Sequence, residues 1–249
     1  MCCFSRPVES VSSTRIFARD ENPTHQFLAY SMSYRAAEDL AMVLPIPVPP
    51  GSREDAVRFI DLHAYADFFS DLHSGFPEPD TLANHPRSRG PIAAAAPAPL
   101  KVERVGSFEA SFVPQIADFG RLDARFQLPK GVWDKLPAYA RYGFAVFKLR
   151  KDATGVHPMA FSFPKPAGSK LFFPTVHIHD GSVHDSAHFD HDLYCQVGAQ
   201  HHRAAGWRES PQNAGAFMQV SSSRGLIDAH AHCYLKRMVG TFKNQDTWV

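Results

Sequence analysis

The sequence contains no apolar run that approaches the roughly 20 residues needed to cross a bilayer. Its N-terminus has no basic region followed by an apolar stretch, so we expect no secretory signal and a cytoplasmic protein. Lysine and arginine are scattered along the chain, and the formal net charge is only +1. Because phosphate binding needs a concentrated basic surface, we expect neither nucleic acid nor a membrane as a partner.

Several catalytic and nucleotide-binding motifs are also missing. The sequence has no glycine-rich phosphate loop, no G-x-S-x-G nucleophile elbow and no H-E-x-x-H zinc motif. Its four cysteines are too few to form a disulfide framework in a chain of 249 residues. We expect these cysteines to be free thiols, available as metal ligands or as small buried side chains.

The residues that are present are typical of a globular, β-rich protein. Hydrophobic residues make up 44% of the chain and charged residues 20%. Strand-like runs occur at 14–19, 101–106 and 108–113, whereas 114–124 and 130–142 indicate short helices. Residues 64–73 place four apolar side chains on one helical face, namely Tyr65, Phe68, Phe69 and Leu72.

The two halves of the chain share a weak repeat. Residues 27–52 resemble residues 144–169 in the order of aromatic residues, prolines and a final Gly-Ser pair. We therefore predict an α+β fold of two related β units packed into one compact protein, divided at 1–99 and 100–249. The first unit ends in a proline- and alanine-rich linker over 76–99. Chance similarity between two proline-rich strand–loop segments is the alternative.

The most informative feature is a cluster of histidines in the second half. Seven of the fourteen histidines lie between positions 177 and 202, together with four aspartates and without a lysine or arginine between Lys170 and Arg203. Imidazole nitrogens and carboxylate oxygens both coordinate divalent metals. The cluster predicts a metal-binding protein whose cofactor is a transition metal ion, copper or zinc, with the metal ion as its partner.

Strand periodicity selects the ligands within this cluster. His177 and His179 project from one side of a strand, and the turn residues Asp180 and Gly181 can bring His184 back beside them. On the next strand, His191 shares a face with Cys195, whereas His188 points to the opposite face. The predicted metal ligands are His177, His179, His184 and His191. Weaker candidates are Cys2, Cys3, His188, Cys195, His230 and His232.

Two local resemblances bear on the metal. The tetrapeptide Val176-His-Ile-His179 resembles the paired copper ligands of copper–zinc superoxide dismutases, which implies copper and nothing further. The run Gly225-Leu-Ile-Asp-Ala-His-Ala-His232 resembles the amidohydrolase signature, which opens a large barrel in that family. Only 17 residues follow His232, so we carry over only a strand that presents Asp228, His230 and His232 on one face.

The N-terminus suggests a different chemistry. Removal of Met1 would expose the amine and thiol of Cys2, which form a chelate for a soft metal, and Cys3 adds a second thiolate. The same free amine would also make Cys2 an N-terminal nucleophile, as in an amidohydrolase. Two cysteines buried under the first sheet are the structural alternative.

Three functions follow from the sequence. The first is a copper or zinc metalloprotein, for which the sequence does not decide between a catalytic, structural or storage site. The second is a non-enzymatic duplicated β scaffold for protein interaction, with solvent-exposed histidines. The third is an N-terminal cysteine nucleophile amidohydrolase.

Overall fold

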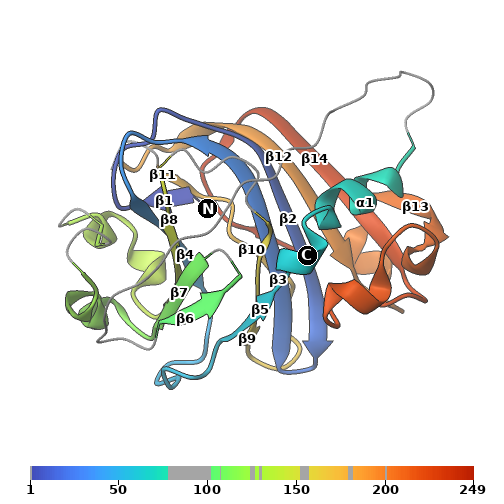
Figure 1. The fold of residues 1–249 in the computed structure, drawn as a ribbon, viewed down its shortest axis with the longest axis horizontal. Helices are drawn as coiled ribbons and strands as arrows, with labels where there is room; N and C mark the ends of the chain where they lie inside the picture. The colour runs from blue at the N-terminus through green and yellow to red at the C-terminus, as the bar shows by residue number, and fades with distance from the viewer. Residues whose placement is uncertain are drawn as a thin grey trace.

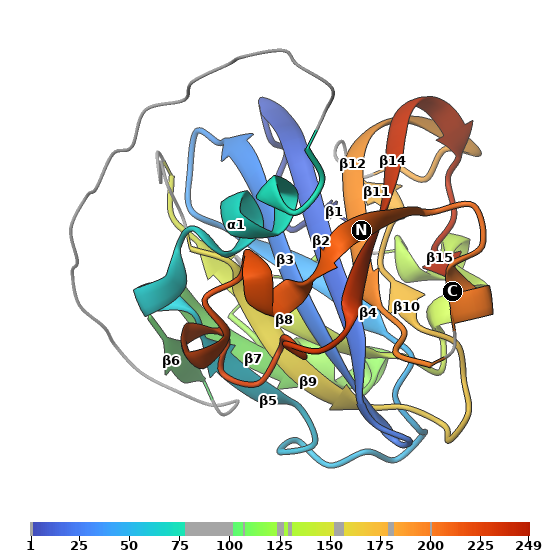
Figure 2. The ribbon, with the colours of Figure 1, turned by 90° about the vertical axis from the view of Figure 1, so that its right-hand side faces the viewer.

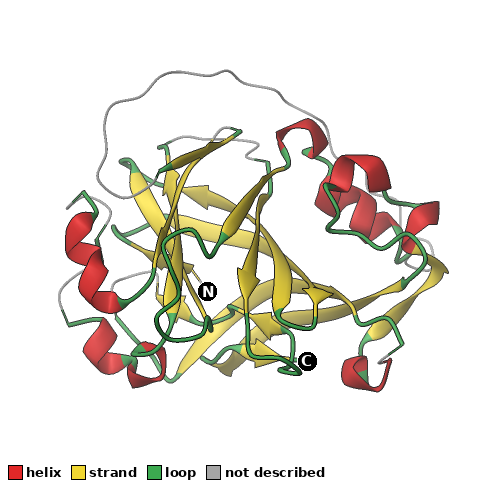
Figure 3. Ribbon diagram, turned by 90° about the horizontal axis from the view of Figure 1, so that it is seen from below, coloured by secondary structure: helices red, strands yellow, loops and turns green. Residues whose placement is uncertain are grey.

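The computed structural model of the protein describes residues 2–77, 102–106, 108–123, 127–128, 131–151, 157–178, 182–199 and 201–249. Two large β-sheets form the body of the molecule, and short helices gather on two sides of them (Figures 1 and 3). The predicted β-rich α+β class with a few short helices is confirmed. Within these ranges, no helix has the length and hydropathy required to span a bilayer.

The first sheet contains the N-terminus as an internal strand. Its six strands follow the order β11 (His177–Ile178), β1 (Cys2–Phe4), β4 (Leu40–Ile46), β8 (Gly143–Leu149), β7 (Phe108–Val113) and β6 (Glu103–Val105). Strand β1 runs parallel to β11 and antiparallel to β4. The first described residues are therefore hydrogen-bonded on both sides within a sheet.

The second sheet contains the long strands of the molecule. Its seven strands follow the order β13 (Arg208–Asn213), β14 (His232–Lys243), β12 (Ser186–Gln196), β2 (Ser10–Asn22), β3 (His25–Arg35), β9 (Met159–Pro164) and β5 (Arg58–Asp61). The pair β12–β2 is parallel and its neighbours are antiparallel. A small antiparallel pair joins β10 (Phe172–Phe173) to β15 (Thr247–Trp248).

Side-chain alternation divides the hydrophobic residues into layers. On β4, Leu40, Met42 and Leu44 point into the core between the two sheets, whereas Ala41 and Val43 point to the outer face. The second sheet repeats this pattern, because Ile16 faces the central core and Phe17 the opposite side. Both sheets therefore have two buried faces over much of their area, which explains strands with little polar alternation.

Short helices cover these outer faces. Helix α1 (Phe68–Ser74) follows the 3₁₀ turn η1 (His63–Tyr65), and it lies across β2 and β3 in Figure 2. The predicted apolar face is confirmed, since all four of its side chains are buried. The 3₁₀ turns η7 (Ala214–Ala216) and η8 (Val220–Ser223) join this layer. The first sheet is covered by η2 (Ile116–Arg121), η4 (Trp133–Lys135) and η5 (Pro137–Tyr139), while η6 (His201–Ala204) precedes β13.

The predicted duplication is not shown by the structure and stays a prediction, as does the division at 1–99 and 100–249. The two similar segments form β3–β4 and β8–β9, and these strands pair crosswise: β3 with β9 in one sheet, and β4 with β8 in the other. Each sheet thus takes strands from both halves of the chain. Most of the predicted linker at 76–99 lies outside the described residues.

Candidate functional site

Two of the predicted ligands meet between the two sheets. His177 comes from β11 and His191 from β12, and their Nε2 atoms lie 3.1 Å apart. The rings are stacked with centroids 4.8 Å apart, and Phe189 packs against both. Both side chains are buried, with exposed fractions of 9% and 2%. We call His177 and His191 the inter-sheet histidine pair.

The other predicted ligands do not join this pair. His184 is exposed and precedes β12, and His188 is exposed on the opposite face of that strand. His179 lies outside the described residues. Cys195 faces the central core, where burial strongly raises the pKa of its thiol. Strand alternation therefore separates residues that are close together in the sequence.

The predicted strand carrying Asp228, His230 and His232 is wrong for its first two members. Asp228 and His230 lie in a turn, in which the Asp228 carboxylate accepts a hydrogen bond from the backbone N–H of His230 (2.9 Å). Such a local bond is how aspartate initiates turns. His232 begins β14, where its Nδ1 lies 2.7 Å from the Ser210 carbonyl oxygen. It therefore belongs to the β13–β14 edge.

The two N-terminal cysteines are held by β1. The backbone of Cys2 pairs with His177, and Cys3 pairs with Ile178 on one side and Val43 on the other. The Cys3 side chain is fully buried under the outer layer of the first sheet, as the structural alternative for these cysteines predicts. For Cys2, the structure describes only the backbone.

These positions overturn the metal hypothesis. Among the described residues, no group of three or more histidine, cysteine, aspartate or glutamate side chains lies close enough together to hold a metal ion. The predicted copper or zinc protein is therefore wrong. Its physical basis fails because His184 and His188 point to solvent, whereas His177 and His191 bond to each other.

A segment near the C-terminus holds β11 from its other edge. The Asn244 side chain accepts a hydrogen bond from the His177 backbone N–H (2.7 Å) and donates one to the His177 carbonyl oxygen (3.0 Å). It also donates to the His184 carbonyl oxygen (2.9 Å). One asparagine thus replaces the neighbouring strand that β11 lacks on this side.

Asp246 extends this attachment. Its carboxylate accepts hydrogen bonds from the backbone N–H groups of Thr175 (2.9 Å) and Val176 (3.2 Å) and from the Tyr139 hydroxyl (2.6 Å). Burial raises the pKa of Asp246 above its usual value, and these three donors oppose that rise. No sequence motif marks Asn244 or Asp246, because each acts through positions some 70 residues away.

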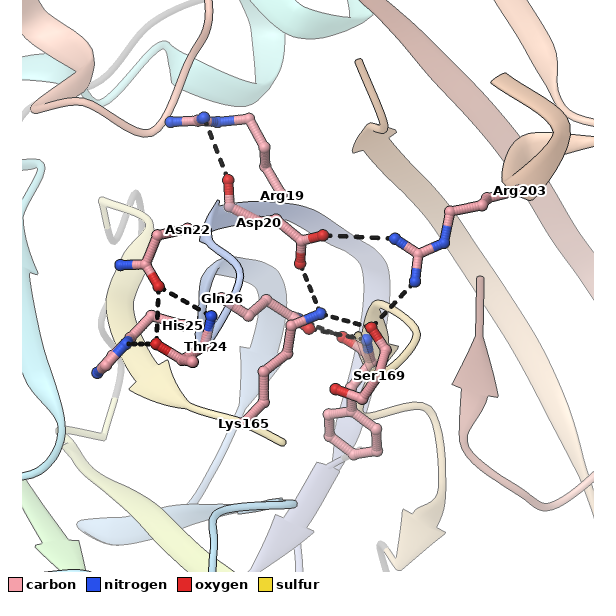
Figure 4. Close-up of polar contacts among 10 residues, drawn as sticks. Arg19, Asp20, Asn22, Thr24, His25, Gln26, Lys165, Ser169 and Arg203 are labelled. Atoms are coloured by element: carbon pink, nitrogen blue, oxygen red, sulfur yellow. Dashed lines mark hydrogen bonds and ion pairs between the residues drawn. The ribbon is translucent and has the colours of Figure 1, made fainter. Parts of the chain in front are cut away.

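A second polar network lies at the β2–β3 turn (Figure 4). The buried Lys165 ammonium lies 2.6 Å from the Asp20 carboxylate and donates to the Ser169 carbonyl oxygen (2.7 Å). Arg203 donates to the same carbonyl (3.0 Å) and lies 3.4 Å from the same carboxylate. Two cations thus share one carboxylate and one carbonyl, an arrangement that joins three separate loops.

The helical layer is joined to the second sheet through hydroxyl groups. Tyr65 donates to Asp71 (2.8 Å) and accepts a hydrogen bond from the Gln219 backbone N–H (2.8 Å). Nδ1 of His73 lies 2.9 Å from the hydroxyl of the buried Tyr194. At the end of this layer, the Arg208 guanidinium donates to the Pro77 carbonyl oxygen.

A second histidine pair lies beside Gly106, which directly follows β6. The rings of His63 and His157 meet edge to face with centroids 5.5 Å apart. Nδ1 of the buried His157 lies 3.0 Å from the Pro158 carbonyl oxygen, and burial lowers the pKa of this imidazole from 6.5. We call His63 and His157 the β6 histidine pair.

One surface depression of about 580 Å³ lies between the β4–β5 and β7–η2 loops. Arg121 crosses it, 2.6 Å from Glu54 and 3.6 Å from Asp118. These ion pairs are partly exposed, and such pairs contribute little to stability. The described residues that line this depression include none of the site residues predicted from the sequence.

Solved structures of one protein share the fold of this chain. No protein-family model and no curated protein matches the chain. Among solved structures, baculovirus P35 matches over 97% of this chain and 96% of its own, with a TM-score of 0.52 and 13% sequence identity. Identity this low shows a shared fold only.

Two further P35 structures match with TM-scores of 0.47. A mutated P35 after caspase cleavage is 13% identical, and the match covers 96% of this chain and 97% of that chain. P35 in the caspase-8/P35 complex is 12% identical, with 95% of each chain covered.

Proposed function

We propose that this chain is a non-enzymatic β scaffold that binds another protein, and we name caspase-8 as the first partner to test. The observation that carries this proposal is the likeness to the P35 fold along nearly the whole chain. P35 is also known in a complex with caspase-8, which selects the partner for the test.

The uses of the polar side chains support a binding role over catalysis. The inter-sheet histidine pair is internally bonded, and burial raises the pKa of the Cys233 thiol to about 12. A thiol with so high a pKa is a poor nucleophile at neutral pH, because the reactive species is the thiolate. No observation favours the N-terminal nucleophile hydrolase, which stays a prediction from the sequence.

Size-exclusion chromatography with light scattering tests the proposal directly. The purified chain is mixed with active caspase-8, and residual protease activity is followed on a fluorogenic peptide. We expect a complex of defined mass and loss of protease activity as the chain is added. Absence of a complex at every concentration would overturn the choice of partner. Turnover of amide or ester substrates by the chain itself would overturn its non-enzymatic nature.

Two variants of α1 show whether the scaffold itself is required. Leu72→Asp places a charge on the buried face of the helix, whereas Ser70→Asp places one on its exposed side. Unpaired buried charge is strongly destabilising. We expect Leu72→Asp to abolish the complex and Ser70→Asp to retain it.

A further inference from the structure

The helical layer covers only part of the outer face of the seven-stranded sheet. It packs on Phe17, Phe27 and Leu235, which are buried beneath α1 and the neighbouring turns. The far ends of β2 and β3 extend past α1 in Figure 2. At this end of the sheet, within the described part of the chain, outward side chains such as His188 and Val239 reach solvent. We call the outward positions of 10–15, 31–35, 186–192 and 237–243 the open face.

Positive side chains from three strands lie on the open face. Arg15 follows the alternation of β2, two residues before the outward Phe17. Arg35 and Lys243 lie beside Tyr34 and Phe242, whose side chains pack on the central core, so both cations point outward. Within the ranges that the structure describes, none of these three cationic groups makes a hydrogen bond or an ion pair.

The carboxylates of the open face, in contrast, already have partners. Asp192 accepts a hydrogen bond from the Arg237 guanidinium (3.2 Å), and Asp190 accepts one from the backbone N–H of Ser13 (2.8 Å). The cations at the outward positions of these strands therefore outnumber the carboxylates, although the whole chain has a formal net charge of only +1. The open face thus offers positive groups to a ligand that carries carboxylates.

The backbone of β2 is strained where it crosses the open face. Ser13 has φ +54°, in the left-handed region that residues other than glycine rarely adopt. The pairing of β2 with β3 shifts register between Ser12 and Arg15, as at a β-bulge. Bulges change the direction of side chains and are frequent beside functional sites, where backbone strain also concentrates. The strain at Ser13 therefore supports a binding role for the open face.

An apolar side chain lies among these charges. Val239 is 64% exposed, more than any other large hydrophobic side chain of the described residues. It lies directly opposite Asp190 in the β12–β14 pair and two residues from Arg237. An apolar contact bordered by arginine and other polar groups is the usual composition of a protein–protein interface.

We propose that the open face binds a carboxylate-rich segment of a partner protein. Arg15, Arg35 and Lys243 bind the carboxylates, since charge-assisted hydrogen bonds of this kind are strong, and Val239 provides the apolar contact. A second copy of the chain is a poor occupant, because the excess positive charges of the two copies would face each other. A polyphosphate is also disfavoured, because the carboxylates of β12 lie between the cations of β2 and β14. The inference rests on the proposed binding role but not on caspase-8 as the partner.

Fluorescence anisotropy with a fluorescein-labelled oligo-glutamate peptide tests the open face on the purified full chain. We expect salt-dependent binding that Arg15→Gln/Arg35→Gln weakens at least about fivefold. The matched control is Arg104→Gln/Arg141→Gln, which removes the same charge from exposed arginines elsewhere and should weaken binding less than about twofold. Equal weakening in the two double variants, or no binding at low salt, would overturn the proposal.

A second pair of variants tests the centre of the open face. Val239→Glu and Val102→Glu each place a negative charge at an exposed valine, and only Val239 lies on the open face. We expect Val239→Glu to abolish binding of the oligo-glutamate peptide and Val102→Glu to retain it. Tighter binding of a labelled oligothymidylate than of the peptide would overturn the choice of a protein ligand. Caspase-8 is absent from these mixtures, so the outcome is independent of the test of that partner.

A measurement on the unmodified chain covers the case in which a variant does not fold. Amide NMR spectra are recorded while the oligo-glutamate peptide is added. The proposal predicts that the largest shift changes map to 10–15, 31–35, 186–192 and 237–243. Changes centred on Arg53 and Arg121, at the surface depression, would overturn it.

Discussion

The inter-sheet histidine pair and the β6 histidine pair use the same side chain in different ways. In the first, two ring nitrogens lie 3.1 Å apart and link separate sheets. In the second, the rings of His63 and His157 meet only edge to face, and the nearest partner of His157 Nδ1 is the Pro158 carbonyl oxygen. The first pair is joined by a hydrogen bond between two ring nitrogens, whereas the second is a packing contact.

This difference shows why clustering in the sequence was a poor guide to a metal site. The coupled pair joins positions 14 residues apart within the histidine-rich segment, whereas His184 and His188 of the same segment are exposed. The β6 pair joins residues 63 and 157, which no local pattern connects. Contact between histidines here is set by sheet topology.

Removal of a ring from the coupled pair should have the largest effect on stability. His191→Ala leaves a cavity and removes one hydrogen-bond partner of the His177 ring, so we expect a loss of about 3 kcal/mol in the free energy of unfolding. Urea denaturation measures it. The control His188→Ala, on the exposed face of β12, should change stability by less than about 0.5 kcal/mol. Equal effects of the two variants would contradict a structural role for the pair.

A backbone change beside the β6 pair should have the next largest effect. Gly106 has φ +58°, and a Cβ placed there would lie 2.4 Å from His157 Nε2 and 2.8 Å from an Asp61 carboxylate oxygen. We expect Gly106→Ala to cost about 2 to 3 kcal/mol of unfolding free energy through strain and steric clash.

Gly168→Ala separates these two causes. Gly168 has φ +73°, but among the described residues none other than its chain neighbours lies within 4 Å of the added Cβ, so only the backbone strain of about 1 kcal/mol remains. Chemical denaturation of both variants provides the comparison. If Gly106→Ala were as stable as Gly168→Ala, the close packing of His157 against Gly106 would be incorrect.

The contribution of the β6 histidine pair to the free energy of unfolding should depend on pH through His157. Burial lowers the pKa of His157, so the unfolded chain binds a proton more readily than the folded chain. The stabilisation is complete above about pH 6.5 and is lost as the pH falls through the lower value in the folded protein. His157→Gln should reduce the fall in urea midpoint between neutral and mildly acidic pH. An equal fall in the urea midpoint in His157→Gln and in the wild type would contradict the assignment of this pH dependence to His157.

The smallest effect is expected for the partner ring. His63 is exposed and contributes only a ring-edge contact, so His63→Ala should cost less than about 1 kcal/mol. Its backbone N–H donates to the Asp61 carboxylate, and this bond persists in the variant. Thermal unfolding suffices to measure the change. A loss as large as that of His191→Ala would show that the two pairs are alike.

The sequence predicted the parts of the fold that depend on local periodicity. The buried face of α1, with Phe68 and Leu72, follows from helical spacing, and the buried run of His191, Leu193 and Cys195 follows from strand alternation. These patterns are properties of neighbouring residues, which a single sequence contains in full.

The remainder depended on contacts between distant residues. Nothing in the sequence indicates that Asn244 would bond to both peptide groups of His177, or that Lys165 and Arg203 would share Asp20. The metal prediction failed for the same reason, because convergence of imidazoles depends on which strands are neighbours. Topology of this kind comes from burial over the whole chain.

The most direct test of the account is a pair of double-mutant cycles at neutral pH, one for each histidine pair. Each cycle uses alanine variants and measures the coupling free energy of unfolding. We predict about 1 kcal/mol or more between His177 and His191, because their rings share a hydrogen bond, and less than about 0.5 kcal/mol between His63 and His157. Coupling that is negligible for the first pair, or equal in the two, would contradict the central claim that a hydrogen bond between His177 and His191 links the two sheets.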